Sequence, residues 1–508
     1  MVSHLKKLSA FIKEAGAASR LTDKYILAML LIYPLFVGFW GYTRLTVSKS
    51  VFFAVLTLLW LMLTVAASVK SRDAATSRAG NAPLRLILAY FALCCASALF
   101  SPYGASVLLG EGRFDGLLSL LLCAAVLFGT ARFAEPKCAD LAASAASGVI
   151  CCLIGIAQLF GFNPFDLFPS DYNFYDAGSR FSAIFIGTIG NADLFSAYLC
   201  LLLPISAAYY ILAVKRPVWL LPVIAIFGFS LVECKVSAGL LAVCCTALIA
   251  PPLLITNGGR LCRALECFAV LCFAFCLASG FQGGRESGVI RVDFAPSVIS
   301  AALLILAISS AIASLLLKKS DFPPKKLQVF FASLSCVIVL ASLAAVYYIP
   351  PESGTLYELS QVLHGNFDDS FGSSRLLIWR ETLALFSDRP LLGSGPGTLP
   401  LRVDIEFSRY VEETGQTLRS YVDNAHNEYL GILINTGLLS LLCHLAAQAA
   451  SVILAAKHGG TAAKCLICGL VCYWIQAFFG LGLIIVSPFM WLCWGLLISA
   501  LNNNEART

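Results

Sequence analysis

A histidine at the end of a long polar stretch is the residue whose type and position point most directly to catalysis. His426 lies where a polar segment, from about residue 350 to 427, gives way to an apolar run. A neutral imidazole at such a boundary accepts a proton from a hydroxyl group near neutral pH. We predict His426 as a catalytic base, with its neighbours Asn427 and Glu428 helping to position the substrate. The alternative is a residue at a helix start that only bonds to backbone.

Basic residues elsewhere in the chain have the chemistry to bind phosphate. Arg180 precedes a glycine-containing stretch that leads to Asn191 at an expected helix start. Arginine offers a planar fork of N–H donors to phosphate oxygens. A helix N-terminus adds free backbone N–H groups. Arg180 and Asn191 are therefore predicted to contact a phosphorylated substrate.

The polar segment itself is expected to contain a helix at the membrane surface. Ser373 and Ser374 can cap a helix running to about residue 387, with Arg375 and Trp379 on one face. Arg380 follows on the same helix. Both arginines are candidates for binding an anionic group on the substrate.

Two more basic residues could have either a structural or a functional role. Arg113 lies in Glu-Gly-Arg-Phe-Asp-Gly, where Asp115 could simply cap the next helix and Arg113 could instead touch substrate. Lys235 lies in a short loop, where a lysine that reaches to the membrane interface is the simpler explanation.

The elements that position these residues belong to a membrane protein. Of the 508 residues, 59% are hydrophobic and only 13% are charged, and the mean hydropathy is +0.83. Soluble proteins carry roughly 25% charged residues. The 20 cysteines lie mostly in apolar runs, where they serve as small packing residues. Neither Cys465, Cys468 and Cys472 nor the Asp404–Glu406 pair predicts a metal site, because no interleaved ligand set accompanies them.

Apolar runs of about 20 residues predict transmembrane helices, because backbone groups cannot stay unpaired in lipid. We expect an all-α, polytopic transmembrane helix bundle of about 14 spans. They lie near 25–42, 51–69, 84–100, 116–133, 140–160, 192–213, 217–232, 237–255, 263–280, 296–317, 327–349, 428–456, 462–481 and 483–501.

The distribution of basic residues predicts the orientation. Most of the 35 Lys and Arg fall on one side if the N-terminus is cytoplasmic. The expected organisation is a basic cytoplasmic segment at 1–24, spans 1–11 within 25–349, a large extracytoplasmic loop with short interfacial helices at 350–427, spans 12–14 within 428–501 and a cytoplasmic tail at 502–508. We predict a multi-pass protein of the cytoplasmic (inner) membrane with both termini inside.

Four stretches resemble the superfamily of O-antigen ligases and polymerases, which are bacterial membrane glycosyltransferases. Arg375-Leu-Leu-Ile-Trp379 with the following Arg389-Pro-Leu-Leu-Gly-Ser-Gly-Pro-Gly397 is similar to the outer-loop pattern of that family, and so is Ala425-His-Asn-Glu-Tyr-Leu430. Gly190-Asn-Ala-Asp193 and Arg113-Phe-Asp-Gly116 add to the likeness. Lys235 stands in Cys-Lys-Val-Ser, where members commonly carry a Ser-Arg-Gly-like element.

The resemblance implies a GT-C-like fold and glycan transfer on the outer face, metal-independent, inverting and without a cofactor. The donor would be an undecaprenyl-pyrophosphate-linked glycan, and the acceptor a hydroxyl of a glycan, lipid or protein; no nucleic acid is involved. A pyrophosphate leaving group needs fixed cations where charge develops. Arg180 and Lys235, with Arg375 or Arg380, would supply them, His426 would be the base, and Arg113, Asn191, Asn427 and Glu428 would help to position the acceptor.

Three alternatives stay open at this point. The chain could be a ligase or a polymerase of the same superfamily. A lipid flippase or transporter is a different class, which usually places ionisable residues at mid-membrane and repeats its halves. A non-catalytic scaffold for envelope assembly would need neither His426 nor the arginines.

Overall fold

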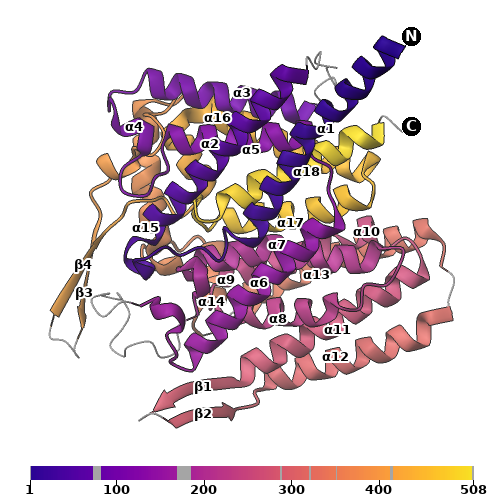
Figure 1. The fold of residues 1–508 in the computed structure, drawn as a ribbon. Coiled ribbons are helices and arrows are strands. Elements are labelled where there is room, and N and C mark those ends of the chain that lie inside the picture. The colour runs from indigo at the N-terminus through magenta and orange to yellow at the C-terminus, as the bar shows by residue number, and fades with distance from the viewer. Residues whose placement is uncertain are drawn as a thin grey trace.

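The computed structural model describes residues 2–71, 82–168, 185–286, 289–319, 322–349, 352–411 and 416–505. Nearly all of its elements are helices (Figure 1), which confirms the prediction of an all-α membrane bundle. Within these ranges, eight helices are long and apolar enough to cross a membrane, and five shorter apolar helices accompany them.

The long helices are α2 (Leu45–Ser71, preceded by the turn η1, Gly41–Arg44), α3 (Ala82–Leu99), α6 (Cys138–Leu159), α7 (Ala192–Leu212), α11 (Gly258–Gly280), α12 (Val298–Leu316), α13 (Pro324–Tyr348) and α16 (Glu428–His458). The five shorter ones are α5 (Leu117–Phe133), α8 (Leu220–Glu233), α9 (Ser237–Ile249), α17 (Thr461–Ala477) and α18 (Ser487–Glu505). Every span predicted after the first overlaps one of these thirteen helices. The short helices α4 (Ser106–Leu109), α10 (Pro251–Leu254), α14 (Thr355–Leu363) and α15 (Phe371–Ala384) lie between them.

The first predicted span, 25–42, was wrong in its bounds. Helix α1 runs from Val2 to Leu31, so it begins inside the basic segment and stops well before residue 42. Pro34 disfavours helical continuation through the residue before it. Lys49 of α2 is fully buried and donates from Nζ to the carbonyl oxygens of Tyr33 and Pro34, both at 3.1 Å. These bonds hold the turn that follows the end of α1 against α2.

The bundle has two distinct ends (Figure 1). Both termini lie at one end, whereas α4, α15 and two β-hairpins lie at the other, which we call the loop face. The hairpins pair β1 (Phe281–Glu286) with β2 (Val289–Phe294), and β3 (Glu406–Val411) with β4 (Gln416–Tyr421). The β3–β4 hairpin is closed at its base, because the Val422 N–H donates to the Ile405 carbonyl at 3.0 Å. The polar segment between α13 and α16 thus folds into α14, α15 and this hairpin.

Helix α16 is interrupted at Gly437, and a glycine-rich stretch fills the interruption. This stretch, residues 390–397, is called the glycine loop below. The Leu438 N–H donates to the Pro390 carbonyl at 2.9 Å, and the Gly395 N–H donates to the Asn435 carbonyl at 2.8 Å. Gly437 has a φ of 87°, where a side chain is strained, and a Cβ there would lie 2.1 Å from the Leu391 carbonyl oxygen. The break therefore ties the polar segment to the start of α16.

Gly437→Ala should destabilise the protein, because the added methyl group meets backbone and the φ is positive. We expect a loss of about 1–3 kcal/mol, seen as a lower midpoint of thermal unfolding in detergent. Gly431→Ala is the matched control in the same helix, since nothing lies within 4 Å of a Cβ at that position. That control should gain about 0.5–1 kcal/mol. Equal midpoints for the two variants would contradict this account of the break.

Candidate active site

Residues from several distant segments meet at the loop face around His426. The charges that act on its imidazole come from Arg375 of α15, Asp193 of α7, Arg113 before α5 and Asp423 just before α16. Since these segments are hundreds of residues apart in some cases, the site exists only in the folded bundle.

His426 is held in a strained position immediately before α16. Its φ is +48°, in the left-handed region, and its backbone N–H donates to Oδ1 of Asn424 at 3.0 Å. The side chain is half-buried. Burial lowers the pKa of His426 below its ordinary value, and the positive charge of Arg375 lowers it further. The imidazole is therefore neutral at pH 7 and is able to accept a proton.

Arg375 is the cation whose charge most affects His426. Its Nη2 lies 3.6 Å from Oδ1 of Asp193, and its Nη1 donates to the Gly372 carbonyl at 3.2 Å. Its Nε is buried and has no hydrogen-bond partner among the described residues. A buried guanidinium nitrogen without a partner is costly, and an anion would satisfy it.

Asn191 lies at the N-terminus of α7, and Lys235 lies in the bend between α8 and α9. The Oδ1 of Asn191 accepts from the Leu194 N–H at 3.0 Å, so this side chain caps α7 and its amide nitrogen stays available. Lys235 is exposed in the bend between α8 and α9, with a φ of +56°. The charge of Asp193 acts on the adjacent Cys234, which places this bend near the Arg375–Asp193 pair.

Arg180 lies within residues 169–184, outside the described part of the chain. The stretches on both sides are anchored, since Phe168 and Phe185 are buried. Its predicted role in binding phosphate stays a prediction.

Arg113 is joined to the site through an ion pair. Its Nε donates to Oδ2 of Asp423, three residues before His426. Asp115 does not cap the following helix: Gly116 is the N-cap of α5 and makes no side-chain bond. Burial instead raises the pKa of Asp115 to about 6, and its Oδ1 has no hydrogen-bond partner among the described residues. The capping interpretation of Asp115 was therefore wrong.

Arg380 lies on the same helix as Arg375 but in a different setting. Its side chain is 60% exposed and pairs with Asp369 at 2.6 Å and Glu381 at 3.1 Å. The predicted start of this helix was also wrong: Gly372, Ser373 and Ser374 have left-handed backbone angles, and no side chain caps the helix. Arg375 is thus brought to His426 and Arg380 is held by surface carboxylates.

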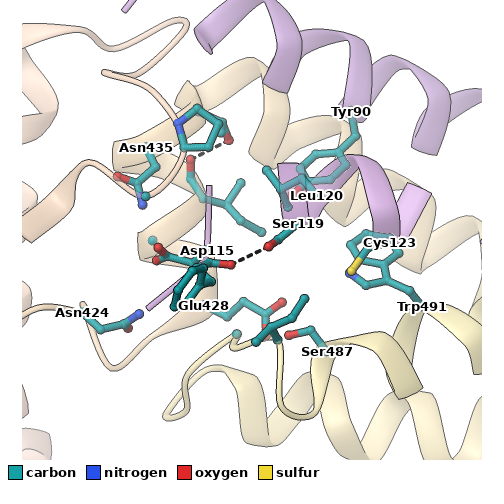
Figure 2. A pocket seen from close by; sticks show the side chains of 18 of the residues that line it. Tyr90, Asp115, Ser119, Leu120, Cys123, Asn424, Glu428, Asn435, Ser487 and Trp491 are labelled. Atoms are coloured by element: carbon teal, nitrogen blue, oxygen red, sulfur yellow. Dashed lines mark hydrogen bonds between the residues drawn. The ribbon is translucent and has the colours of Figure 1, made fainter. Parts of the chain in front are cut away.

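Asn427 and Glu428, which follow His426 in the chain, line a cavity of about 110 Å³ (Figure 2). Oδ1 of Asn427 accepts from the Leu430 N–H at 3.0 Å and caps α16. The Glu428 carboxyl group accepts a long bond of 3.4 Å from the Tyr473 hydroxyl. Asp115 lines the same cavity, although it comes from a segment more than 300 residues earlier.

Asp115, Asp193 and Asp423 were not predicted as site residues. An acidic residue in the first turn of a helix is ordinary, so Asp193 carries no signal in the sequence. Arg402 was missed as well. It holds the glycine loop beside the site, donating to Oγ of Ser394 at 3.0 Å and to Oδ1 of Asn435 at 3.2 Å.

Comparison with known families identifies one part of the chain. Residues 297–445 match the family model described as O-antigen ligase. This segment covers less than one third of the 508 residues, from α12 to the first half of α16, and contains Arg375, Arg380 and residues 426–428. Arg113, Arg180, Asn191 and Lys235 lie before it. No curated protein matches the chain.

Proposed function

We propose, from the premise that residues 297–445 form an O-antigen ligase domain, that this protein transfers a glycan from undecaprenyl pyrophosphate to an acceptor hydroxyl. The domain supports a ligase- or glycosyltransferase-like activity in a multi-pass membrane protein. One observation carries the finer proposal. His426 is half-buried and neutral, and its pKa is lowered by the charge of Arg375, whose Nε lacks a partner among the described residues.

The proposed step is a single displacement with inversion. His426 accepts the proton of the acceptor hydroxyl as its oxygen forms a bond to the anomeric carbon of the donor glycan. The bond from that carbon to the pyrophosphate oxygen breaks, and undecaprenyl pyrophosphate leaves with the electron pair. Arg375 stabilises the charge that develops, with Lys235 and Arg180 as further cations, so no metal ion is required for this role. His426 then releases its proton to water.

We further propose that the loop face is outside the cytoplasmic membrane and that both termini are inside. His364, exposed between α14 and α15, gives a direct test. In H364C, a membrane-impermeant maleimide should label the introduced thiol in intact cells, whereas Cys138, exposed at the opposite end of the bundle, should react only after permeabilisation. Labelling in the reverse order would overturn the orientation.

The glycan profile of a deletion strain tests the function and separates the alternatives. Full-length polymer left unattached on its lipid carrier would identify a ligase. Single repeat units left on the carrier would identify a polymerase of the same superfamily. Carrier-linked glycan trapped on the inner face would instead favour a flippase, and an unchanged profile would contradict all three.

A further inference from the structure

The cavity beside His426 has a composition that the transfer step alone does not explain. It is bounded by the turn before α5, the glycine loop, the first turns of α16 and the start of α18. Asn424 and Asn427 flank His426 in the chain and both line it. Neither Arg375 nor Asp193 nor Lys235 lines it. His426 itself does not line it either, so the cavity is separate from the surface that carries the cations, and Asn424 and Asn427 place it close to His426 along the chain.

The polar side chains that line the cavity include two carboxyls and three amides, together with hydroxyls from Ser119, Thr436, Ser487 and Tyr90. Figure 2 shows Asp115 and Glu428 between Asn424 and Asn435 on one side and Tyr90, Cys123 and Trp491 on the other. Among the lining residues there is no lysine, arginine or histidine. The nearest arginine in sequence, Arg113, is paired with Asp423.

These polar groups are left with hydrogen-bonding capacity. The Oδ1 of Asp115 is buried without a partner among the described residues, and Glu428 accepts only the long bond from Tyr473. In Asn427 and Asn435 the side-chain oxygens are engaged, by the Leu430 N–H and by Arg402, which leaves their amide N–H groups. Carboxylate oxygens accept from hydroxyls, and amide N–H groups donate to them. Such a set matches a ring of hydroxyl groups.

The size and the apolar wall of the cavity fit a single sugar residue. One water needs roughly 10–15 Å³ of such space, so a cavity of about 110 Å³ holds several waters or the hydroxyl-bearing part of one ring. Tyr90 and Trp491 contribute aromatic ring atoms to the apolar part of the wall, against which the C–H groups of a pyranose can pack.

We propose that this cavity is the subsite for the reacting sugar of the acceptor, and that it selects neutral or ammonium-bearing sugars over sugars with a carboxylate or phosphate. An anionic group placed beside Asp115 and Glu428 would find no cation among the described residues that line the cavity, and it would be desolvated at a cost. The same two carboxyl groups disfavour the pyrophosphate of the donor in this cavity and favour its binding at the surface that carries Arg375. The assignment of the bound sugar as the acceptor rests on the proposed function. The selectivity for neutral or ammonium-bearing sugars rests on the cavity alone.

The test measures binding without turnover. The purified full-length chain is examined by saturation-transfer NMR with methyl N-acetylglucosaminide, methyl glucosaminide and methyl glucuronide as probes. We expect binding of the first two and at least about tenfold weaker binding of the glucuronide, the ratio that 1.4 kcal/mol gives. In a protein carrying Asp115→Asn and Glu428→Gln the ratio should fall toward one. Asp369→Asn, an exposed carboxylate that pairs with Arg380, is the matched control and should leave the ratio unchanged.

A second variant guards against misfolding of the first. Gly431 lines the cavity on α16, and nothing lies within 4 Å of a Cβ there. Gly431→Leu should therefore fill the space from a position where its Cβ meets no atom, and it should remove binding of all three probes without lowering the unfolding midpoint. Equal binding of the glucuronide by the wild type, or unchanged binding in Gly431→Leu, would overturn the subsite. Selective binding in a protein that transfers no glycan would uphold the subsite and reject the proposed function instead.

Discussion

His426→Ala should reduce glycan transfer by about 10²–10⁴-fold in kcat while expression and membrane insertion stay at the wild-type level. The reason is that the imidazole is neutral, half-buried and next to the cation proposed to hold the leaving group. The measurement is transfer of radiolabelled glycan from its lipid carrier by purified protein. Full activity in this variant would remove the assigned base.

A second substitution separates chemistry from backbone strain. His426 has a φ of +48°, which asparagine tolerates better than alanine does. His426→Asn should therefore keep the wild-type unfolding midpoint and lose transfer to the same extent as His426→Ala. A variant that regains transfer with asparagine would indicate a structural role for this position.

The acid limb of the wild-type pH profile follows from the same residue. Free histidine has a pKa of about 6.5, and burial and Arg375 lower the pKa of His426. Since the base must be neutral, transfer should be retained at pH 6.5 and decline only at lower pH. In Arg375→Lys the positive charge beside His426 remains. The pH at which transfer declines should therefore stay close to that of the wild type.

Arg375→Ala should lower kcat by about 10²–10³-fold, the cost of removing one preorganised donor to a developing charge. Arg375→Lys should recover part of this loss, because lysine restores the charge without the two-pronged geometry. Arg380→Ala should cost far less, since Arg380 is exposed and already paired with two carboxylates.

Arg419→Ala is the control for a general loss of positive charge at the loop face. Arg419 lies on the β3–β4 hairpin, 67% exposed, and pairs with Glu406 at 3.3 Å. The Arg419→Ala variant should transfer glycan at the wild-type rate. Similar losses for Arg375 and Arg419 would mean that Arg375 acts through the overall field and not through contact with pyrophosphate.

Hydropathy predicted the helices well because each span is an independent stretch of apolar residues that must pair its own backbone. Its error at α1 has a physical cause. Helix α1 ends at Leu31, shortly before Pro34, and the turn that follows is held by bonds from Lys49, a residue on the next helix. A window of hydropathy contains no information about such a contact. The break in α16 at Gly437 was missed for the same reason, since it needs the Pro390 carbonyl.

The candidate site was predicted where a residue type is unusual for its position and missed where it is ordinary. His426 and Arg375 could be predicted as candidates because ionisable groups at a membrane boundary are informative. Their neighbourhood was not, because Asp193 and Asp423 look like common helix-start and turn residues. Asp115 was assigned to a helix cap, and only its burial next to Glu428 reveals the second polar surface. Pairings across hundreds of residues are decided by packing, which a single sequence does not display.

The closed base of the β3–β4 hairpin has a consequence for how this protein can diversify. The chain leaves the bundle at Ile405 and rejoins it at Val422, two residues joined by one backbone bond. A change of length or sequence between them should therefore leave the span of the glycine loop and the position of His426 as they are. Lineages could therefore remodel this arm to meet different envelope surfaces while the reacting groups stay fixed, and the same interval is a natural place to graft a rigid fiducial for imaging.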